Sequence, residues 1–307
     1  MLAVWRGLPL VVRAVIAGAV VAAAGIVPWS ILAGLNLRVF VRVPWAIVPM
    51  ALYLWLYVKY LGGAGWPRET AQFRRASLRA NAVPGEVWGM SLFAGMLGFA
   101  ALLPLLRIMN RLVRLPAEAQ PIVTPPQMPF VTTFLLLVMA SIVAGVVEES
   151  AFRGYVQTPI ERRHGLALAI LANGALFGFA HYSHHPASVL AMLPFYMTVS
   201  AVYGGLAYAT NSILPGLLLH AGGDVFSLTR LWMTGRPEWQ LSASPPALVW
   251  ETGVDAAFLG SIVAFAIFSA GAAWAYLELA RAARSADTRI GSIRSEWPTS
   301  ASGGTSQ

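Results

Sequence analysis

The sequence predicts an all-α, polytopic membrane protein with about eight transmembrane helices. Of its 307 residues, 57% are hydrophobic and only 11% are charged, and the mean hydropathy is +0.65. A single soluble core cannot bury that much apolar surface, since soluble domains carry about 25% charged residues. Long uninterrupted apolar runs favour helices over barrel strands, in which apolar and polar residues alternate. The chain has no cysteine, which excludes disulfides and thiolate chemistry.

Eight apolar segments follow one another along the chain. The first follows two arginines, but its apolar sequence continues past any small-residue cleavage site, so we expect a retained helix rather than a secretory signal. An arginine-rich stretch at 66–86 separates the second segment from the third and is expected to lie on the membrane surface. The expected spans are residues 15–35, 44–61, 87–106, 129–162, 166–182, 189–209, 213–228 and 254–279.

The spans divide the chain into an N-terminal transmembrane region (1–127), a helical core (128–282) and a Ser/Thr/Arg-rich tail (283–307) expected to be disordered. Eight spans place both termini on one side, and the loops of that side are richer in Lys and Arg. The positive-inside rule therefore predicts cytoplasmic termini. The Ala/Arg/Gly-rich composition suggests a bacterial inner membrane. We attribute the net charge of +8 to loops that face anionic lipid, and expect no nucleic-acid partner.

Ionisable side chains inside membrane helices are costly, so they are candidates for a functional site. They gather on the fourth, fifth and seventh spans: Glu148, Glu149, Arg153, His181, His220 and Asp224. Glu149 precedes Arg153 by four residues, and Phe177 precedes His181 by the same interval. His220 and Asp224 have this spacing too. Residues four apart share one helix face, so each pair is expected to act together.

The hairpin formed by the fourth and fifth spans predicts a meeting of two of these groups. The chain is expected to turn near Gly165, and Glu148 and His181 each lie about 16 residues from it. At a rise of 1.5 Å per residue, both lie roughly 25 Å from the turn, at one level. We therefore expect a water-filled cavity between the fourth, fifth and seventh spans, with these two side chains inside it.

A carboxylate beside an imidazole can deprotonate water and pass the proton to a leaving group, the role expected of Glu148 and His181. His220, oriented by Asp224, can donate a hydrogen bond to an oxyanion. The only lysine is Lys59, so the serines near the site have no lysine base. This favours direct attack by activated water over a serine nucleophile.

Each of these groups also has a structural interpretation. Glu149 and Arg153 are equally typical of a buried ion pair that offsets the cost of the buried carboxylate. His181 alone is more typical of a hydrogen bond between packed helices, and the pair His220 and Asp224 can be a polar bridge. Their occurrence together, on three helices at matched spacing, favours a functional site.

The motifs resemble those of a known family. Residues 148–153 (EESAFR) resemble an EExxxR motif, 177–181 (FGFAH) an FxxxH motif, and 220–224 (HAGGD) an HxxxN/D motif. In this order, over about 130–228, they resemble the CPBP (ABI) family of intramembrane proteases, which includes the type II CAAX prenyl endopeptidases. Prenyl-protease members carry Asn at the last motif position, where this chain has Asp224.

The resemblance implies an eight-helix, glutamate-dependent protease. Glu148 and His181 would activate water, and His220 and Asp224 would stabilise the oxyanion. The supporting residues implied by the motifs are Glu149, Arg153 and Phe177. The implied activity is hydrolysis of a peptide bond in a membrane-associated peptide, with a lipidated, CAAX-like peptide as one candidate.

Three alternatives stay open. A non-catalytic member of the same fold would serve as a bacteriocin-immunity or scaffold protein. A transporter would use the carboxylates as a proton relay, but the internal repeat typical of transporters is not evident. A metal-free mechanism is expected because the HExxH motif is absent; the alternative is a divalent metal such as zinc on Glu148, His181 and His220.

Overall fold

The computed structural model describes residues 7–115, 122–181 and 186–296. This part of the chain is helical and contains no β-strand, which confirms the all-α class. The long and medium helices are α2 (Leu10–Asn36), α3 (Ile47–Leu61), α5 (Gly85–Leu112), α6 (Phe130–Glu148), α8 (Leu166–Ala180), α9 (Pro186–Thr210), α10 (Leu214–Thr234) and α12 (Ala256–Glu296). The short ones are η1 (Arg68–Thr70), α4 (Ala71–Leu78), η2 (Glu149–Gln157), α7 (Thr158–His164) and α11 (Val249–Thr252).

Each of the eight expected spans coincides with a helix, but the number of membrane crossings is not confirmed. Within the described residues, five helical segments are long and apolar enough to cross a membrane: Leu10–Asn36, Gly85–Leu112, Phe130–His164, Val189–Thr210 and Ala256–Ala286. Two other apolar helices, α3 and α8, have only 15 residues each. The helix α10 has 21 residues, and its polar residues lower its hydropathy.

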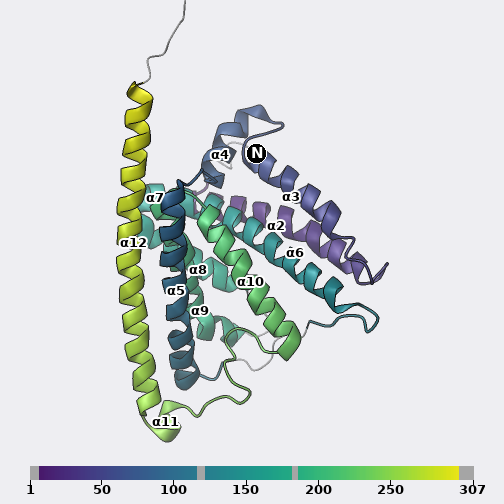
Figure 1. Ribbon diagram of the computed structural model, residues 1–307, viewed down its shortest axis with the longest axis vertical. Coiled ribbons are helices and arrows are strands. Elements are labelled where there is room, and N and C mark those ends of the chain that lie inside the picture. The colour runs from purple at the N-terminus through teal and green to yellow at the C-terminus, as the bar shows by residue number, and fades with distance from the viewer. Residues whose placement is uncertain (1–6, 116–121, 182–185, 297–307) are drawn as a thin grey trace, which may run out of the picture.

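The helices form a layered bundle (Figure 1). Helices α5 and α12 lie side by side along one flank, and α6 and α10 form a second packed pair. Helix α2 covers α6 and η2, and α8 packs against α9. The close approach of α6 to α10 depends on Gly145, where a Cβ would lie 3.0 Å from Ala221 Cβ and 3.1 Å from the Leu217 carbonyl oxygen. This contact brings the C-terminal end of α6 against the N-terminal half of α10.

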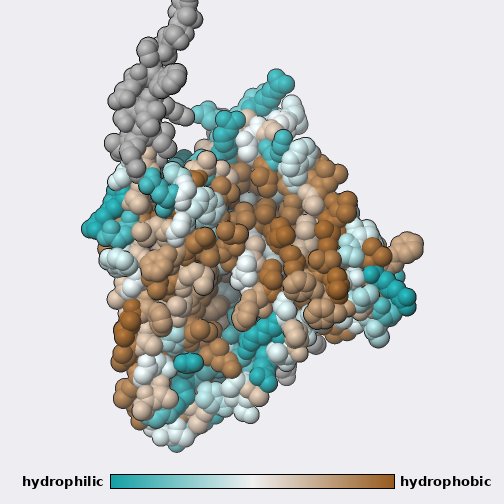
Figure 2. Space-filling model, in the orientation of Figure 1, coloured by the Kyte–Doolittle hydropathy of each residue, from teal (hydrophilic) through white to brown (hydrophobic). Residues whose placement is uncertain are grey.

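Apolar side chains cover the middle of the molecule, and hydrophilic ones gather at its two ends (Figure 2). The same face is hollowed between α5 and α10. The N-terminal end and the C-terminal end of α12 lie at the same end of the bundle, and α11 lies at the other (Figure 1). An apolar middle between hydrophilic ends is the distribution expected of a polytopic helical membrane protein.

The fourth span continues as one helical segment from Phe130 to His164 and turns at Gly165, which has φ +87°. Its middle, η2, is a nine-residue π-helix rather than the expected α-helix. Pro159 explains the change, because it lacks an N–H and its ring would clash with the carbonyl of Tyr155 in a regular α-helix. The chain therefore widens just before the proline, in the segment that carries Glu149 and Arg153.

Two segments outside the core differ from expectation. Part of the stretch expected on the membrane surface is tied to the core, since Arg79 is buried and forms an ion pair with Glu161 at 3.0 Å. Helix α12 continues to Glu296, so helix occupies the first half of the tail that was expected to be disordered. Residues 297–307 lie outside the described residues.

Candidate active site

Two adjacent carboxylates lie against one buried imidazole. His220 on α10 is 5% exposed, and its Nδ1 lies 2.9 Å from Glu149 Oε1. Its Nε2 lies 3.6 Å from Glu148 Oε2. Neighbouring residues of an α-helix point about 100° apart, yet here both glutamates reach opposite nitrogens of the same ring. The imidazole is therefore held by Glu149 on one side and presents Nε2 to Glu148 on the other.

His181 completes the group from the C-terminal end of α8. Its Nδ1 lies 2.8 Å from the Phe177 carbonyl oxygen, so Nδ1–H is the donor and the neutral ring keeps its lone pair on Nε2. That Nε2 lies 4.0 Å from Glu148 Oε2. The meeting of Glu148 and His181 agrees with the hairpin geometry expected from the sequence. His184 and His185, which follow it, lie outside the described residues.

Arg153 is fully buried and contacts the carboxylate–imidazole group through Glu149. Its Nη1 lies 3.2 Å from Glu149 Oε1, in the expected ion pair one turn along the helix. Its guanidinium lies 4.8 Å from the ring centroids of both Phe177 and Tyr203, a cation–π arrangement from two sides. The arginine therefore fixes Glu149, and the phenylalanine of the second motif packs against both Arg153 and His181.

Asp224 faces His220, as the spacing predicts, but lies farther from the ring than Glu149 does. Its Oδ2 lies 3.7 Å from His220 Nε2, and its side chain is 30% exposed. The shorter contact, to Nδ1, is made by Glu149, so Glu149 rather than Asp224 holds the ring. Asp224 instead faces the same nitrogen as Glu148, at the edge of the cavity.

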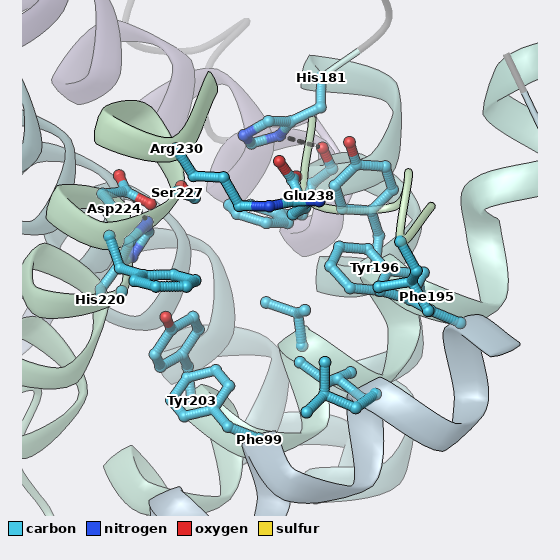
Figure 3. Close-up of a pocket in the computed structure, with 18 residues that line it drawn as sticks. Phe99, His181, Phe195, Tyr196, Tyr203, His220, Asp224, Ser227, Arg230 and Glu238 are labelled. Atoms are coloured by element: carbon cyan, nitrogen blue, oxygen red, sulfur yellow. Dashed lines mark hydrogen bonds and ion pairs between the residues drawn. The ribbon is translucent and has the colours of Figure 1, made fainter. Parts of the chain in front are cut away.

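An apolar cavity of about 490 Å³ opens onto the imidazoles (Figure 3). His181, His220 and Asp224 line it together with apolar residues of α5 and α9. The cavity was expected between the fourth, fifth and seventh spans. The fifth and seventh do line it, but most of its apolar wall comes from the third and sixth, α5 and α9. Glu148 and Glu149 of the fourth span are not among the lining residues and approach the cavity only through the imidazoles. The aliphatic and aromatic lining is Phe99, Leu102, Leu103, Leu106, Phe177, Phe195, Tyr196, Val199, Tyr203, Phe226 and Leu241.

Five polar residues of the site were not identified from the sequence: Tyr196, Tyr203, Ser227, Arg230 and Glu238. The Tyr203 ring stacks on His220, with centroids 4.9 Å apart and planes at 13°, and the Tyr196 ring lies 5.2 Å from that of His181. Both tyrosines lie on α9, seven residues or about two turns apart. That spacing was a usable signal, but an aromatic stripe in an apolar helix is far more often plain packing.

Arg230 and Glu238 lie at the end of the cavity remote from η2. Arg230 donates hydrogen bonds from Nη1 to the Pro237 carbonyl (2.7 Å) and from Nη2 to the Gln240 carbonyl (2.6 Å). It thereby holds the loop after α10, which carries Glu238 into the cavity. Loop residues of this kind have no helical periodicity, so the sequence offered no signal for them.

The arrangement can perform acid–base chemistry on a bound water. Glu148 Oε2 has no hydrogen-bond partner among the described residues, and it lies within 4.0 Å of two imidazole nitrogens. Within the same residues, no group of three or more His, Asp or Glu side chains has the arrangement that a metal ion requires. The set considered for zinc, Glu148, His181 and His220, is not among such groups.

Residues 130–226 match the family model "Type II CAAX prenyl endopeptidase Rce1-like". The matched segment runs from the start of α6 into α10 and contains all seven motif residues. No curated protein and no solved structure matches the chain. The segment is thus similar to this family, in agreement with the resemblance to the CPBP proteases.

Proposed function

We propose that the protein is an intramembrane endopeptidase that hydrolyses a peptide bond in a membrane-associated peptide, lipidated or not, without a metal. The observation that carries the proposal is the position of Glu148. Its Oε2, which makes no hydrogen bond among the described residues, lies 4.0 Å from His181 Nε2 and 3.6 Å from His220 Nε2, and both imidazoles line the apolar cavity. The Rce1-like domain supports the protease class.

In the proposed reaction, Glu148 takes a proton from water as the hydroxyl oxygen attacks the peptide carbonyl carbon. The carbonyl π electrons move to its oxygen, which becomes the oxyanion. His220 in its protonated form donates Nδ1–H to Glu149 and Nε2–H to this oxyanion. As the tetrahedral intermediate collapses, the C–N bond breaks, and the proton held by Glu148 passes to the leaving amine directly or through His181.

Asp224 and the aromatic residues have supporting roles in this proposal. Asp224 orients His220 Nε2 from the cavity side, at 3.7 Å. Tyr203 stacks on the His220 ring and fixes its plane, and Arg153 fixes the Glu149 carboxylate through their ion pair. Because the groups are held before substrate arrives, little reorganisation is needed in the transition state.

The shape of the cavity supports a substrate with an apolar segment. Its wall is mostly aliphatic and aromatic, and a volume of about 490 Å³ is within the range of ligand pockets. Most of the wall residues lie on α5 and α9, which are long and apolar enough to cross a membrane. We propose a peptide substrate at or in the bilayer, for which a CAAX-like lipidated peptide is one candidate.

The first experiment is cleavage of a fluorogenic peptide library, with prenylated and unprenylated members, by purified protein in liposomes. We expect Glu148→Gln and His181→Ala to abolish cleavage, while Glu69→Gln, at an exposed position, retains it. A chelator is expected to have no effect. If no peptide is cleaved and Glu148→Gln preserves the cellular phenotype, the non-catalytic scaffold interpretation replaces this one.

We propose a bacterial inner-membrane location with both termini in the cytoplasm. The absence of cysteine makes this directly testable, because any introduced cysteine is unique. Glu69, in η1 just before α4, and Ser244, in the loop before α11, are both exposed, and α4 and α11 lie near opposite ends of the bundle (Figure 1). A membrane-impermeant thiol reagent should label Ser244→Cys in intact spheroplasts, and Glu69→Cys only after permeabilisation. The reverse pattern would invert the topology.

A further inference from the structure

A row of buried polar side chains continues from the candidate active site along one face of the fourth span. Glu149, Arg153, Gln157 and Glu161 follow at intervals of four residues through η2 and α7. The first three are 0% exposed, and the Glu161 side chain is 9% exposed. Four such residues in a buried helix are expensive unless each finds partners, so their contacts decide what the row does.

The two ends of the row are satisfied by protein groups. Glu149 bonds His220 at one end, and Glu161 forms a two-pronged ion pair with Arg79 at the other (3.0 and 3.1 Å). Gln157 donates from Nε2 to Glu161 Oε2 at 3.0 Å and to the Gly204 carbonyl at 2.9 Å. These contacts connect η2 and α7 to α9 and to the segment after α4.

The middle of the row is not satisfied in this way. Arg153 has an ion pair with Glu149, but none of its three guanidinium nitrogens has a hydrogen bond of good geometry among the described residues. The Oε1 atom of Gln157 also has no hydrogen-bond partner there. A guanidinium with unused donors and an amide oxygen with unused lone pairs therefore face the interior one turn apart.

A third unpartnered side chain lies at the same level on the neighbouring helix. Asn173 on α8 is 0% exposed, and neither its Oδ1 nor its Nδ2 has a partner in the described part of the chain. It precedes by one turn Phe177, whose ring contacts the Arg153 guanidinium at 4.8 Å. It follows by three residues Ile170, on the same face of α8.

Ile170 marks the level of Gln157. A Cβ built on Gly204 would lie 2.7 Å from Gln157 Oε1 and 3.3 Å from Ile170 Cγ1, so both side chains flank the same glycine. Asn173 therefore lies between the level of Gln157 and that of Arg153. The absence of a side chain at Gly204 leaves the Gln157 oxygen room beside α9.

We propose that Arg153, Gln157 and Asn173 form an internal water site on the side of the Arg153–Glu149 pair remote from the cavity. More than nine in ten buried polar groups have a partner, and internal waters typically make about three hydrogen bonds to groups that lack one. Here one water accepts from the guanidinium and donates to Gln157 Oε1 and Asn173 Oδ1. The site needs no substrate and stands independently of the proposed protease activity.

The water site solvates a guanidinium that otherwise has one carboxylate and two aromatic faces. With this water, polar contacts are continuous from His220 to Arg79, along the part of the fourth span from Glu149 to Glu161. The charge of Arg153 is thus maintained opposite Glu149 even when an apolar substrate fills the cavity and removes solvent from that side.

The test compares two fully buried asparagines. Asn36, also 0% exposed, is satisfied by protein groups, since it donates to the Val43 carbonyl (3.0 Å) and accepts from the Ala46 N–H (2.9 Å). We expect both Asn173→Leu and Asn36→Leu to lower Tm in detergent, each by about 5 °C, because each removes satisfied hydrogen bonds. If the Asn173 site is dry, Asn173→Leu removes an unsatisfied amide, and Tm rises while Asn36→Leu still lowers it.

A high-resolution structure of the wild-type protein decides the question even if a variant does not fold. We expect a density peak within about 3 Å of both Asn173 Oδ1 and Gln157 Oε1. A map that resolves other buried waters but shows none here, or side chains that pair directly, overturns the proposal. Neither measurement uses activity, so a failure of the proposed function cannot be mistaken for a failure of the water site.

Discussion

Glu148 and Glu149 are adjacent in sequence, but their replacement by glutamine is expected to have opposite consequences. Glu149 is 0% exposed, pairs with Arg153 at 3.2 Å and bonds His220 at 2.9 Å. Glu148 is 15% exposed and its Oε2 has no hydrogen bond within the described residues. The first side chain stabilises the fold, and the second is free to react.

The magnitude follows from what each change leaves behind. Glu149→Gln leaves a fully buried guanidinium without its counter-ion, a change that costs about 3–5 kcal/mol. Glu148→Gln breaks no hydrogen bond of the described structure, so its effect on stability is expected within about 0.5 kcal/mol. In a protein of this size the two variants should differ in Tm by on the order of 10 °C.

Thermal unfolding in detergent, followed by tryptophan fluorescence, measures the difference, and peptide cleavage measures activity on the same samples. We expect Glu148→Gln to unfold like the wild type and to be inactive, and Glu149→Gln to unfold at lower temperature. The double variant Glu149→Gln/Arg153→Met serves as a control, and it should recover part of the lost stability because no unpaired charge remains. Equal destabilisation by the two single variants would refute the reasoning, since it would make Glu148 a structural residue as well.

Three further predictions concern other parts of the molecule. Tyr203→Phe should keep Tm and activity because the ring that stacks on His220 and Arg153 remains, whereas Tyr203→Leu should lower Tm and reduce kcat about tenfold as the imidazole loses its fixed plane. Arg79→Met should cost about 3–5 kcal/mol by leaving Glu161 unpaired in a buried position, and Arg79→Met/Glu161→Gln should cost less; equal costs would contradict the ion pair. The Arg111 hydrogen bond lowers the pKa of Asp255 below its ordinary 3.8, so the carboxylate contributes stability above that pH, and the contribution is lost as pH falls through the lower folded-state value. The Tm difference between wild type and Asp255→Asn should accordingly shrink as the pH falls below about 3.8, and a difference that grows as the pH falls would contradict this sign.

Much of the architecture could be predicted because it depends on local periodicity and hydropathy. An apolar run of sufficient length specifies a helix wherever its partners lie, and the hairpin around Gly165 follows from counting residues at a fixed rise. The same arithmetic anticipated the approach of Glu148 and His181. The number of crossings was harder, because α3 and α8 are 15-residue helices whose relation to the bilayer depends on tilt and packing.

The contact partners within the site could not be predicted, because they depend on long-range packing. Spacing alone paired His220 with Asp224, as both lie on one face of α10. The structure gives the closest contact to Glu149 instead, 71 residues away in the sequence. Nothing local to either motif encodes that approach; it depends on Gly145, which lets α10 come close to α6.

Two adjacent glutamates serve one imidazole although the backbone between them is regular. Glu148 has φ −73° and ψ −40°, and Glu149 has φ −64° and ψ −39°, so their side chains leave the helix about 100° apart. Their oxygens nevertheless reach opposite nitrogens of His220, at 3.6 and 2.9 Å. The convergence therefore depends on the side-chain torsions and on the position of the His220 ring between the two carboxylates. Arg153 fixes the Glu149 side chain through its ion pair, and this determines which nitrogen of His220 is left to face Glu148.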